Sequence, residues 1–347
     1  MMKEIIENVK IEKMARNFIK SPQKMGELHE ADAEILEWGE EGSSYLAVTT
    51  DALVEEITSG LYDDPYFIGW MLAMVNFSDL AAVGAEPVGL LFTIACSSTE
   101  DDEFLDKLTK GISDACKRLN TYVLGGDTNH GKILFLSGCA VGIVPRKRVL
   151  TRKGARPGDR LYMTRPAGLG NVFAFAKLSN QDLDLITSMY QPVARTKEAK
   201  IIRKFANCCM DTSDGVIHTL DTLMRINQSQ FVLHDEWERI LHPVAHQLVI
   251  SQGLPPWLVL AGVHGEFELC FAISLQEEES FLMEAASIGW APVLIGEIRE
   301  GSGVSIRKRN ELIPLDSAGI RNISEEAGSN PLSYISKLIE IAFNIEA

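Results

Sequence analysis

The stretch PYFIGWMLAMVNFSDLAAVGAEPVGLLFTIAC, residues 65–96, holds a helix and a strand joined by a short break. Apolar side chains recur at helical spacing up to Val83, Pro65 suits the first turn of the helix, and Gly84 suits its C-terminal stop. From Val88 to Cys96 almost every residue is apolar, which predicts a buried strand. The chain therefore passes from a long helix directly into the interior of a sheet.

The same two patterns continue on both sides of this stretch. The run YLAVTT, residues 45–50, alternates apolar and polar residues, as a half-buried strand does. Residues 103–119 carry an apolar stripe at helical spacing, with acidic residues in the first turn. Further strands are expected at Tyr122–Leu124 and at Ile133–Val144, the latter broken by Gly138 and Gly142. These elements predict one α+β unit.

The segment PRKRVLTRKGARPGD, residues 145–159, is basic, rich in Gly and Pro, and without apolar periodicity. It is the best candidate for a domain boundary, and we expect one domain over residues 1–148 and a second over 149–347. In the second domain we expect strands at Leu161–Thr164, Leu258–Gly262, Glu268–Ile273 and Pro292–Ile295, and helices at Gly168–Lys177 and Asn330–Ala347. The predicted fold class is α+β (mixed α/β) with two domains.

Composition limits the function. The 347 residues are 46% hydrophobic and 23% charged, as in an ordinary globular protein. Acidic residues outnumber basic ones 48 to 33, leaving a net charge of -15, which argues against nucleic acid as a partner. The N-terminus lacks the apolar core of a secretory signal, and no apolar run has the length of a membrane span. We expect a soluble, cytoplasmic protein.

Aspartates are the residues that recur in predicted loops and at predicted strand ends. They are Asp32, Asp51, Asp79, Asp127, Asp211 and Asp214. No phosphate-binding loop of the form GxxxxGK[ST] and no kinase catalytic loop occurs. Carboxylates gathered at one site raise one another's pKa unless a cation lies between them. Mg²⁺, bound together with phosphate groups, is the usual cation at such a site. Gly125 and Gly126 would let backbone amides approach those phosphates.

The motifs TTD, NFSDLAAVGAEP, LGGDT, GARPGD and MDTSDGV, in this order and spacing, resemble the AIR synthase (PurM-like) superfamily, and most closely its thiamine-monophosphate kinases. The resemblance covers about Asp32 to Leu269. It implies a homodimer whose N-terminal domains pair their sheets into a barrel-like core. It also implies ATP between the two domains of a chain, with several Mg²⁺ ions bridging its phosphates to the aspartates.

The resemblance also implies roles for single residues. Metal ligands or their helpers would be Asp32, Thr49, Thr50, Asp51, Asp79, Asp127, Asp211 and Asp214. Gly125, Gly126, Asp127, Arg152 and Ser213 would contact ATP, and Asp127, Asp214 and Arg152 would act in catalysis. Arginine suits phosphate because its planar guanidinium stays charged and donates in a fork. The implied activity is an ATP- and Mg²⁺-dependent phosphotransferase.

The acceptor half departs from the family pattern. The family's GDDAA is Glu30-Ala31-Asp32-Ala33-Glu34 here, so one of two adjacent aspartates is missing. Thr58 replaces the substrate-contacting histidine of VEGxHF, and GGEDYEL becomes HGEFEL. We expect Thr58, His264 and Glu266 to contact an acceptor that is thiamine phosphate or another polar or phosphorylated metabolite. Two alternatives stay open: ATP-driven activation of an amide or carboxylate, and a nucleotide-binding dimer without turnover.

Overall fold

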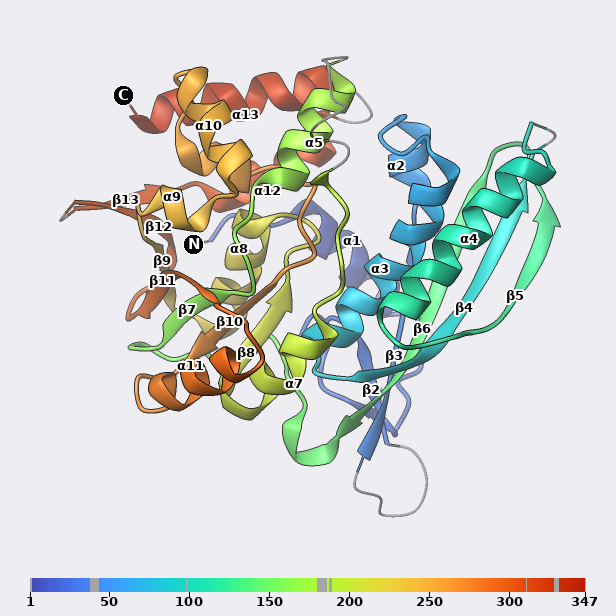
Figure 1. Ribbon diagram of the computed structural model, residues 1–347. Coiled ribbons are helices and arrows are strands. Elements are labelled where there is room, and N and C mark those ends of the chain that lie inside the picture. Colours follow the sequence, from blue (N-terminus) through green and yellow to red (C-terminus); the bar gives the residue numbers. More distant parts are fainter. Residues whose placement is uncertain are drawn as a thin grey trace.

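The computed structural model describes residues 2–37, 44–97, 99–179, 186, 189–309, 311–327 and 331–346. Over these residues it is a mixed α/β protein with two sheets, each covered by helices (Figure 1). The first sheet ends at Pro145 and the second begins at Arg160, with a short 3-10 helix at Arg146–Arg148 between them. None of the described helices combines the length and the apolar character that crossing a membrane requires.

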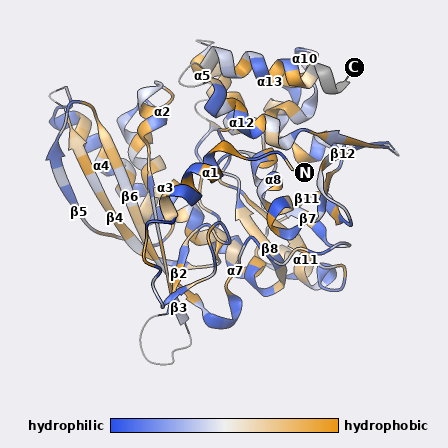
Figure 2. Ribbon diagram, turned by 180° about the vertical axis from the view of Figure 1, so that it is seen from behind, coloured by the Kyte–Doolittle hydropathy of each residue, from blue (hydrophilic) through white to orange (hydrophobic). Residues whose placement is uncertain are grey.

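The first sheet has six strands in the order β1-β2-β3-β6-β4-β5. Their bounds are β1 Lys24–Met25, β2 Glu34–Leu36, β3 Ser44–Ala52, β4 Glu86–Cys96, β5 Val123–His130 and β6 Phe135–Pro145. Helices α3 (Pro65–Ala82) and α4 (Asp102–Arg118) pack on one face of it (Figure 1). Most of α3 is buried, because this helix also faces the second unit, and it stands out as apolar in Figure 2.

Glycines bring α3 close to its neighbours. A Cβ on Gly69 of α3 would lie 2.0 Å from the carbonyl oxygen of Leu108 in α4. A Cβ on Gly138 would lie 2.4 Å from the side-chain nitrogen of Asn76 in α3. The expected break of the strand at Gly138 is therefore wrong: β6 runs through that glycine without interruption, because the missing side chain makes room for the helix.

The second sheet has seven strands in the order β13-β12-β9-β11-β7-β10-β8. Their bounds are β7 Arg160–Met163, β8 Ala206–Asp211, β9 Gln230–Leu233, β10 Leu269–Ile273, β11 Val293–Arg299, β12 Gly303–Lys308 and β13 Glu311–Leu315. The helices of this unit are α5 Leu169–Leu178, α7 Thr196–Phe205, α8 Val216–Asn227, α9 Trp237–Ile240, α10 Pro243–Ser251, α11 Glu278–Ser287, α12 Ser317–Ala327 and α13 Pro331–Glu346. Helix α2 (Val54–Thr58) belongs to the first unit.

Three sequence expectations need correction. Residues 258–262 form no strand, because Pro255 and Pro256 start a 3-10 turn, Pro256–Leu260, in which the missing N–H groups are tolerated. The short strand expected to end at Leu124 continues to His130 as β5, which lies at the edge of the sheet next to β4. Asp79 lies in helix α3 rather than in a loop.

The N-terminal helix α1 (Ile6–Ala15) crosses to the second unit and packs against α12. The Ile6 amide donates to Asn322 Oδ1 at 3.1 Å, and Asn322 Nδ2 donates back to the Glu4 carbonyl at 2.9 Å. Lys10 and Glu325 form an ion pair next to this contact. The N-terminus of the chain therefore forms part of the wall of two cavities to which both units contribute.

Candidate functional site

Three carboxylates from distant parts of the chain meet where the two units join. One oxygen each of Asp32, Asp79 and Asp211 lies within 4.8 Å of the other two. Asp32 precedes β2, Asp79 lies in the last turn of α3, and Asp211 is the last residue of β8. Helix α3 and strand β8 are joined directly here, because Ser78 Oγ donates to Asp211 Oδ2 at 2.6 Å. The cluster is thus built by the contact between the units.

Burial keeps these carboxylates from ionising together. Asp211 is 1% exposed, and burial with the nearby Asp32 charge raises its pKa to about 7, despite hydrogen bonds from Ser78 and Ser213. Burial and the charges of Asp211 and Asp32 raise the pKa of Asp79 well above its usual range. Like charges this close need a cation between them to stay ionised at neutral pH. The donor set of hard oxygens is the one that Mg²⁺ prefers.

One guanidinium touches the cluster. Arg152 donates to Asp32 Oδ1 at 2.9 Å and to the His29 carbonyl at 3.3 Å. Among the described residues, the other carboxylate oxygen of Asp32 has no hydrogen-bond partner although it is buried, and the same holds for Nε of Arg152. A buried polar atom without a partner costs free energy, so these two atoms mark a place suited to a ligand. The residues present therefore fit a divalent cation with a phosphate.

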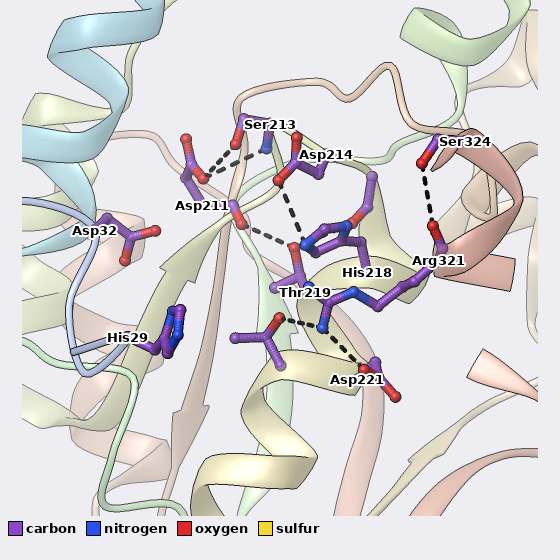
Figure 3. A network of polar contacts seen from close by, with 12 residues as sticks. His29, Asp32, Asp211, Ser213, Asp214, His218, Thr219, Asp221, Arg321 and Ser324 are labelled. Carbon is purple, nitrogen blue, oxygen red and sulfur yellow. Dashed lines mark hydrogen bonds and ion pairs between the residues drawn. The ribbon is translucent and has the colours of Figure 1, made fainter. Parts of the chain in front are cut away.

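Asp214 extends the acidic group toward solvent. It follows Ser213 in the turn between β8 and α8, and its Oδ2 lies 3.4 Å from Nε2 of His218 (Figure 3). Burial lowers the pKa of His218 to about 3, so the ring is neutral at physiological pH. Asp51 lies near the end of β3, and its pKa is raised, first by the loss of solvent around its carboxylate and then by the Asp214 charge.

The sequence patterns did not point to some of the residues that lie at this site. Arg321 of α12 donates to Asp221 Oδ2 at 2.9 Å and lies beside His218 (Figure 3). Glu7 of α1 has a raised pKa, caused by burial first and then by Asp214. His218 stands four residues after Asp214, a helical spacing that could have suggested the contact. Arg321 and Glu7 arrive from the two ends of the chain, and no local pattern announces them.

Asp127 does not join this group within one chain. Asp51 pairs with Gly138, and this glycine faces α3. Asp127 pairs with Thr93, which is on the same side of β4 as Leu91, two residues earlier. Leu91 is exposed on the open side of the sheet, the side away from α3. The two aspartates also lie three strands apart, which is about 14 Å at the usual strand spacing. The expected set of metal ligands is therefore split between two faces. Gly125 and Gly126 stay with Asp127 in β5, and Thr50 points to the same open side.

The acceptor-side residues have partners of their own. His264 is 8% exposed, and its Nε2 lies 3.0 Å from the Tyr190 hydroxyl and 3.2 Å from that of Tyr62. Burial lowers the pKa of His264 to about 4, so this ring is neutral too. Glu266 accepts a hydrogen bond from the Gly170 amide in the first turn of α5, and burial raises its pKa to about 8.

Two cavities meet beside Asp214. The larger, of about 1210 Å³, is lined by Thr58 and His264 but not by Glu266, which differs from the expectation that all three contact the acceptor. The reason is that Glu266 turns inward to cap α5. The smaller cavity, of about 500 Å³, contains Arg152. Both cavities are lined by Ile5, Glu7, Asp214, His218 and Arg321.

The chain is similar to a known protein family and to characterised enzymes. Residues 30–144 match the family described as AIR synthase related protein, N-terminal domain. Thiamine-monophosphate kinase from Methanocaldococcus jannaschii is 34% identical over 248 residues, covering 66% of this chain and 75% of that protein. The enzyme of the same name from Buchnera aphidicola is 30% identical over 265 residues, covering 72% of this chain and 80% of that protein.

Solved structures show the same fold. A structure described as AaThiL complexed with AMPPCP and TMP superimposes with a TM-score of 0.74 at 22% identity, covering 90% of this chain and 98% of that one. A HypE–HypF complex superimposes with a TM-score of 0.70 at 16% identity, covering 87% and 96%. At these identities the agreement establishes the architecture.

Proposed function

Since this chain belongs to the thiamine-monophosphate kinase family, we propose that it transfers the γ-phosphoryl group of ATP to thiamine monophosphate or a closely related phosphorylated metabolite. The observation that carries the proposal is the cluster of Asp32, Asp79 and Asp211, with an unpartnered carboxylate oxygen on Asp32. A structural relative described as a complex with AMPPCP and TMP supports both substrates.

Mg²⁺ would be held by Asp32, Asp79 and Asp211, with Asp51 and Asp214 nearer to solvent. The metal would offset the phosphate charge, which is most of what phosphoryl transfer asks of a protein. Thr49 Oγ1 donates to Asp79 Oδ2 at 2.6 Å and Ser213 Oγ donates to Asp211 Oδ1 at 2.9 Å, so hydroxyl groups fix both carboxylates. This preorganisation lowers the reorganisation needed when charge builds up in the transition state.

We propose that the two cavities receive the two substrates. We place the nucleotide against Arg152 in the smaller cavity and the acceptor in the larger one, so that both reach Asp214. An oxygen of the acceptor phosphate would attack the γ-phosphorus, and the bond from that phosphorus to the β,γ-bridging oxygen would break, releasing ADP. Neutral His218 and the guanidinium of Arg321 would hold the surroundings of Asp214 in place.

The proposed assembly is a homodimer that joins the open faces of two first sheets. Leu91, Phe135 and Ile143 expose 40%, 38% and 46% of their surface on that face. Apolar side chains gathered on one sheet face favour burial against a partner. Asp127 stands on the same face, away from the acidic cluster of its own chain. It would therefore complete the site of the second copy.

Product analysis tests the activity. Protein incubated with Mg·ATP and thiamine monophosphate should release ADP and thiamine diphosphate in equal amounts. Free phosphate in place of the phosphorylated product would favour activation of an amide or carboxylate. Tight binding of Mg·ATP with no ATP consumption would favour the nucleotide-binding dimer. Asp211→Asn, which removes one carboxylate of the cluster, is the inactive control.

Mixing two inactive variants tests the shared site. In a mixed dimer of Asp127→Asn and Asp211→Asn, one of the two sites would keep both aspartates if Asp127 acts on the partner. Activity should then return on co-expression of the two variants. No recovery, with mixed dimers shown to be present, would place Asp127 in the site of its own chain or outside catalysis.

A further inference from the structure

Nitrogen atoms that lack an acceptor gather around the smaller cavity. Nε2 of His29, Nε of Arg152 and Nε of Arg321 are buried and have no hydrogen-bond partner within the part of the chain that the structure describes. All three residues line this cavity of about 500 Å³. His29 lies between β1 and β2, Arg152 precedes β7, and Arg321 belongs to α12 (Figure 3). A buried donor without an acceptor costs free energy, so donors that converge from three segments point to an anionic ligand.

Arg321 carries a positive charge that its contacts only partly balance. This residue is 6% exposed, and its Nη1 donates to Asp221 Oδ2 at 2.9 Å and to Thr222 Oγ1 at 3.1 Å. Arg225 uses the same carboxylate, because its Nε donates to Asp221 Oδ2 at 2.7 Å. One carboxylate therefore serves two guanidinium groups, and a buried positive charge is left beside the cavity.

His29 offers a neutral donor next to these charges. Its backbone carbonyl accepts a hydrogen bond from Arg152 Nη1 at 3.3 Å, which holds the two residues together. Burial lowers the pKa of His29, and the charges of Arg152 and Arg321 lower it further. The ring is therefore neutral at physiological pH and carries one N–H group, which Nε2 can provide.

Acidic side chains also line the smaller cavity, and they determine in which form an anion can enter. They are Glu4, Glu7, Glu12 and Asp214. The ion pairs that the structure describes for Arg152 and Arg321 go to other carboxylates, those of Asp32 and Asp221. The four acidic residues would repel a bare phosphate chain, whereas a chain that carries Mg²⁺ is admitted. The cavity therefore suits a phosphate chain together with its metal ion.

The place of Arg321 gives the phosphates an order. Arg321 lines both cavities, whereas His29 and Arg152 line the smaller one. We propose that the phosphate chain of the nucleotide lies across His29, Arg152 and Arg321, and that Arg321 contacts the γ-phosphoryl group. This rests on the proposed function, which puts the nucleotide in the smaller cavity and the acceptor in the larger one.

Arg321 then acts on the group that is transferred. The acceptor oxygen forms a bond to the γ-phosphorus while the bond from that phosphorus to the β,γ-bridging oxygen breaks and ADP leaves. The guanidinium keeps its protons and donates hydrogen bonds to the non-bridging oxygens throughout. Because Asp221 and Thr222 already hold Arg321 in place, little reorganisation is needed when charge develops on those oxygens.

Nucleotide binding tests the proposal without requiring turnover. Arg321→Gln should lower the affinity for Mg·AMPPCP by about tenfold or more and leave the affinity for Mg·ADP unchanged, because ADP lacks the γ-group. His29→Ala should lower both affinities, and His29→Gln, whose amide can still donate, should lower them less. Isothermal titration calorimetry measures all of these affinities.

Arg225→Gln is the matched control. It removes the other guanidinium at Asp221, and the hydrogen bonds of Arg225, at 2.7 and 3.4 Å, both go to that carboxylate. This variant should lose stability in thermal unfolding and keep the nucleotide affinities of the wild type. Should Arg321→Gln fail to fold, Arg321→Lys takes its place, since it keeps the charge beside Asp221 but lacks the planar fork of donors.

The outcomes separate this proposal from the proposed function. A wild-type protein that binds Mg·AMPPCP but phosphorylates no acceptor would overturn the function alone. Equal losses of affinity for Mg·ADP and Mg·AMPPCP in Arg321→Gln, or equal losses in Arg321→Gln and Arg225→Gln, would overturn the role of Arg321. If the wild type binds neither nucleotide, inorganic tripolyphosphate with Mg²⁺ serves as the probe, and equal affinity in wild type and Arg321→Gln would overturn that role.

Discussion

The carboxylates of the acidic cluster differ from those of Glu266 and Glu268, on the acceptor side, in how their charges are satisfied. Asp32, Asp79 and Asp211 face one another, and one buried oxygen of Asp32 has no partner in the part of the chain that the structure describes. By contrast, Glu268 forms a buried ion pair with Arg195, and Glu266 caps α5. Unsatisfied buried charge identifies a place that awaits a ligand, whereas satisfied charge supports the structure. The predictions below test this distinction, from the largest expected effect to the smallest.

The largest effect is expected at Asp79. Asp79→Asn keeps the shape of the side chain but removes one of the proposed ligands, so kcat should fall on the order of a thousandfold. Stability without Mg²⁺ should not fall, because the substitution relieves repulsion with Asp211. Steady-state kinetics and thermal unfolding measure the two effects. Asp106→Asn, at an exposed position of α4, is the matched control. A marked loss of stability in Asp79→Asn would contradict the distinction.

Arg195 should show the opposite pattern. Arg195→Ala leaves Glu268 buried without its partner, and breaking such a pair costs about 3–5 kcal/mol of unfolding free energy. Activity per folded molecule should change little. Urea unfolding measures the loss, with Lys200→Ala as control, since the exposed pair of Lys200 with Glu86 contributes about 1 kcal/mol or less. An equally small loss at Arg195 would show that the buried pair is not structural.

The pH dependence of stability should separate the two regions. Burial raises the pKa of Asp211 to about 7 and of Glu266 to about 8. Between the unfolded pKa and these values the folded state binds more protons than the unfolded state, so stability falls as pH rises from about 5 to 8. Mg²⁺ should remove the share of this pH dependence that comes from Asp211. The Glu266→Gln substitution should remove the share that comes from Glu266. Unfolding curves at several pH values, with and without Mg²⁺, check this; a Mg²⁺ effect that Asp211→Asn leaves intact would contradict it.

The sequence predicted local structure better than spatial groupings. The helix that begins at Pro65 and the strand that ends at Cys96 were confirmed within two residues, because apolar periodicity and proline or glycine punctuation are local. The cluster of Asp32, Asp79 and Asp211 was expected, since the motifs name those residues. Asp127 was expected beside them, but the face on which a strand residue points depends on pairing, which the chain order does not give.

The acceptor residues show a second limit. Glu266 and His264 were expected to contact substrate because of their place in a family motif, yet one caps α5 and the other is bonded to two tyrosines. A motif position identifies a residue type and a neighbourhood. It does not tell whether helix ends or aromatic hydroxyl groups from other segments, here Tyr62 and Tyr190, have already used the polar atoms.

The smallest effect is expected at Thr58, which lines the larger cavity and whose hydroxyl already has a hydrogen-bond partner. Its hydroxyl donates to the Val54 carbonyl at 2.7 Å, within α2, so it is not free to hold a phosphate. Thr58→Ala should therefore change KM for the acceptor by less than about threefold, a difference below 1 kcal/mol. Steady-state kinetics over a range of acceptor concentrations measure it. A tenfold or larger rise in KM would mean that the hydroxyl leaves Val54 when substrate binds, and that satisfied groups in the structure without substrate can still serve the acceptor.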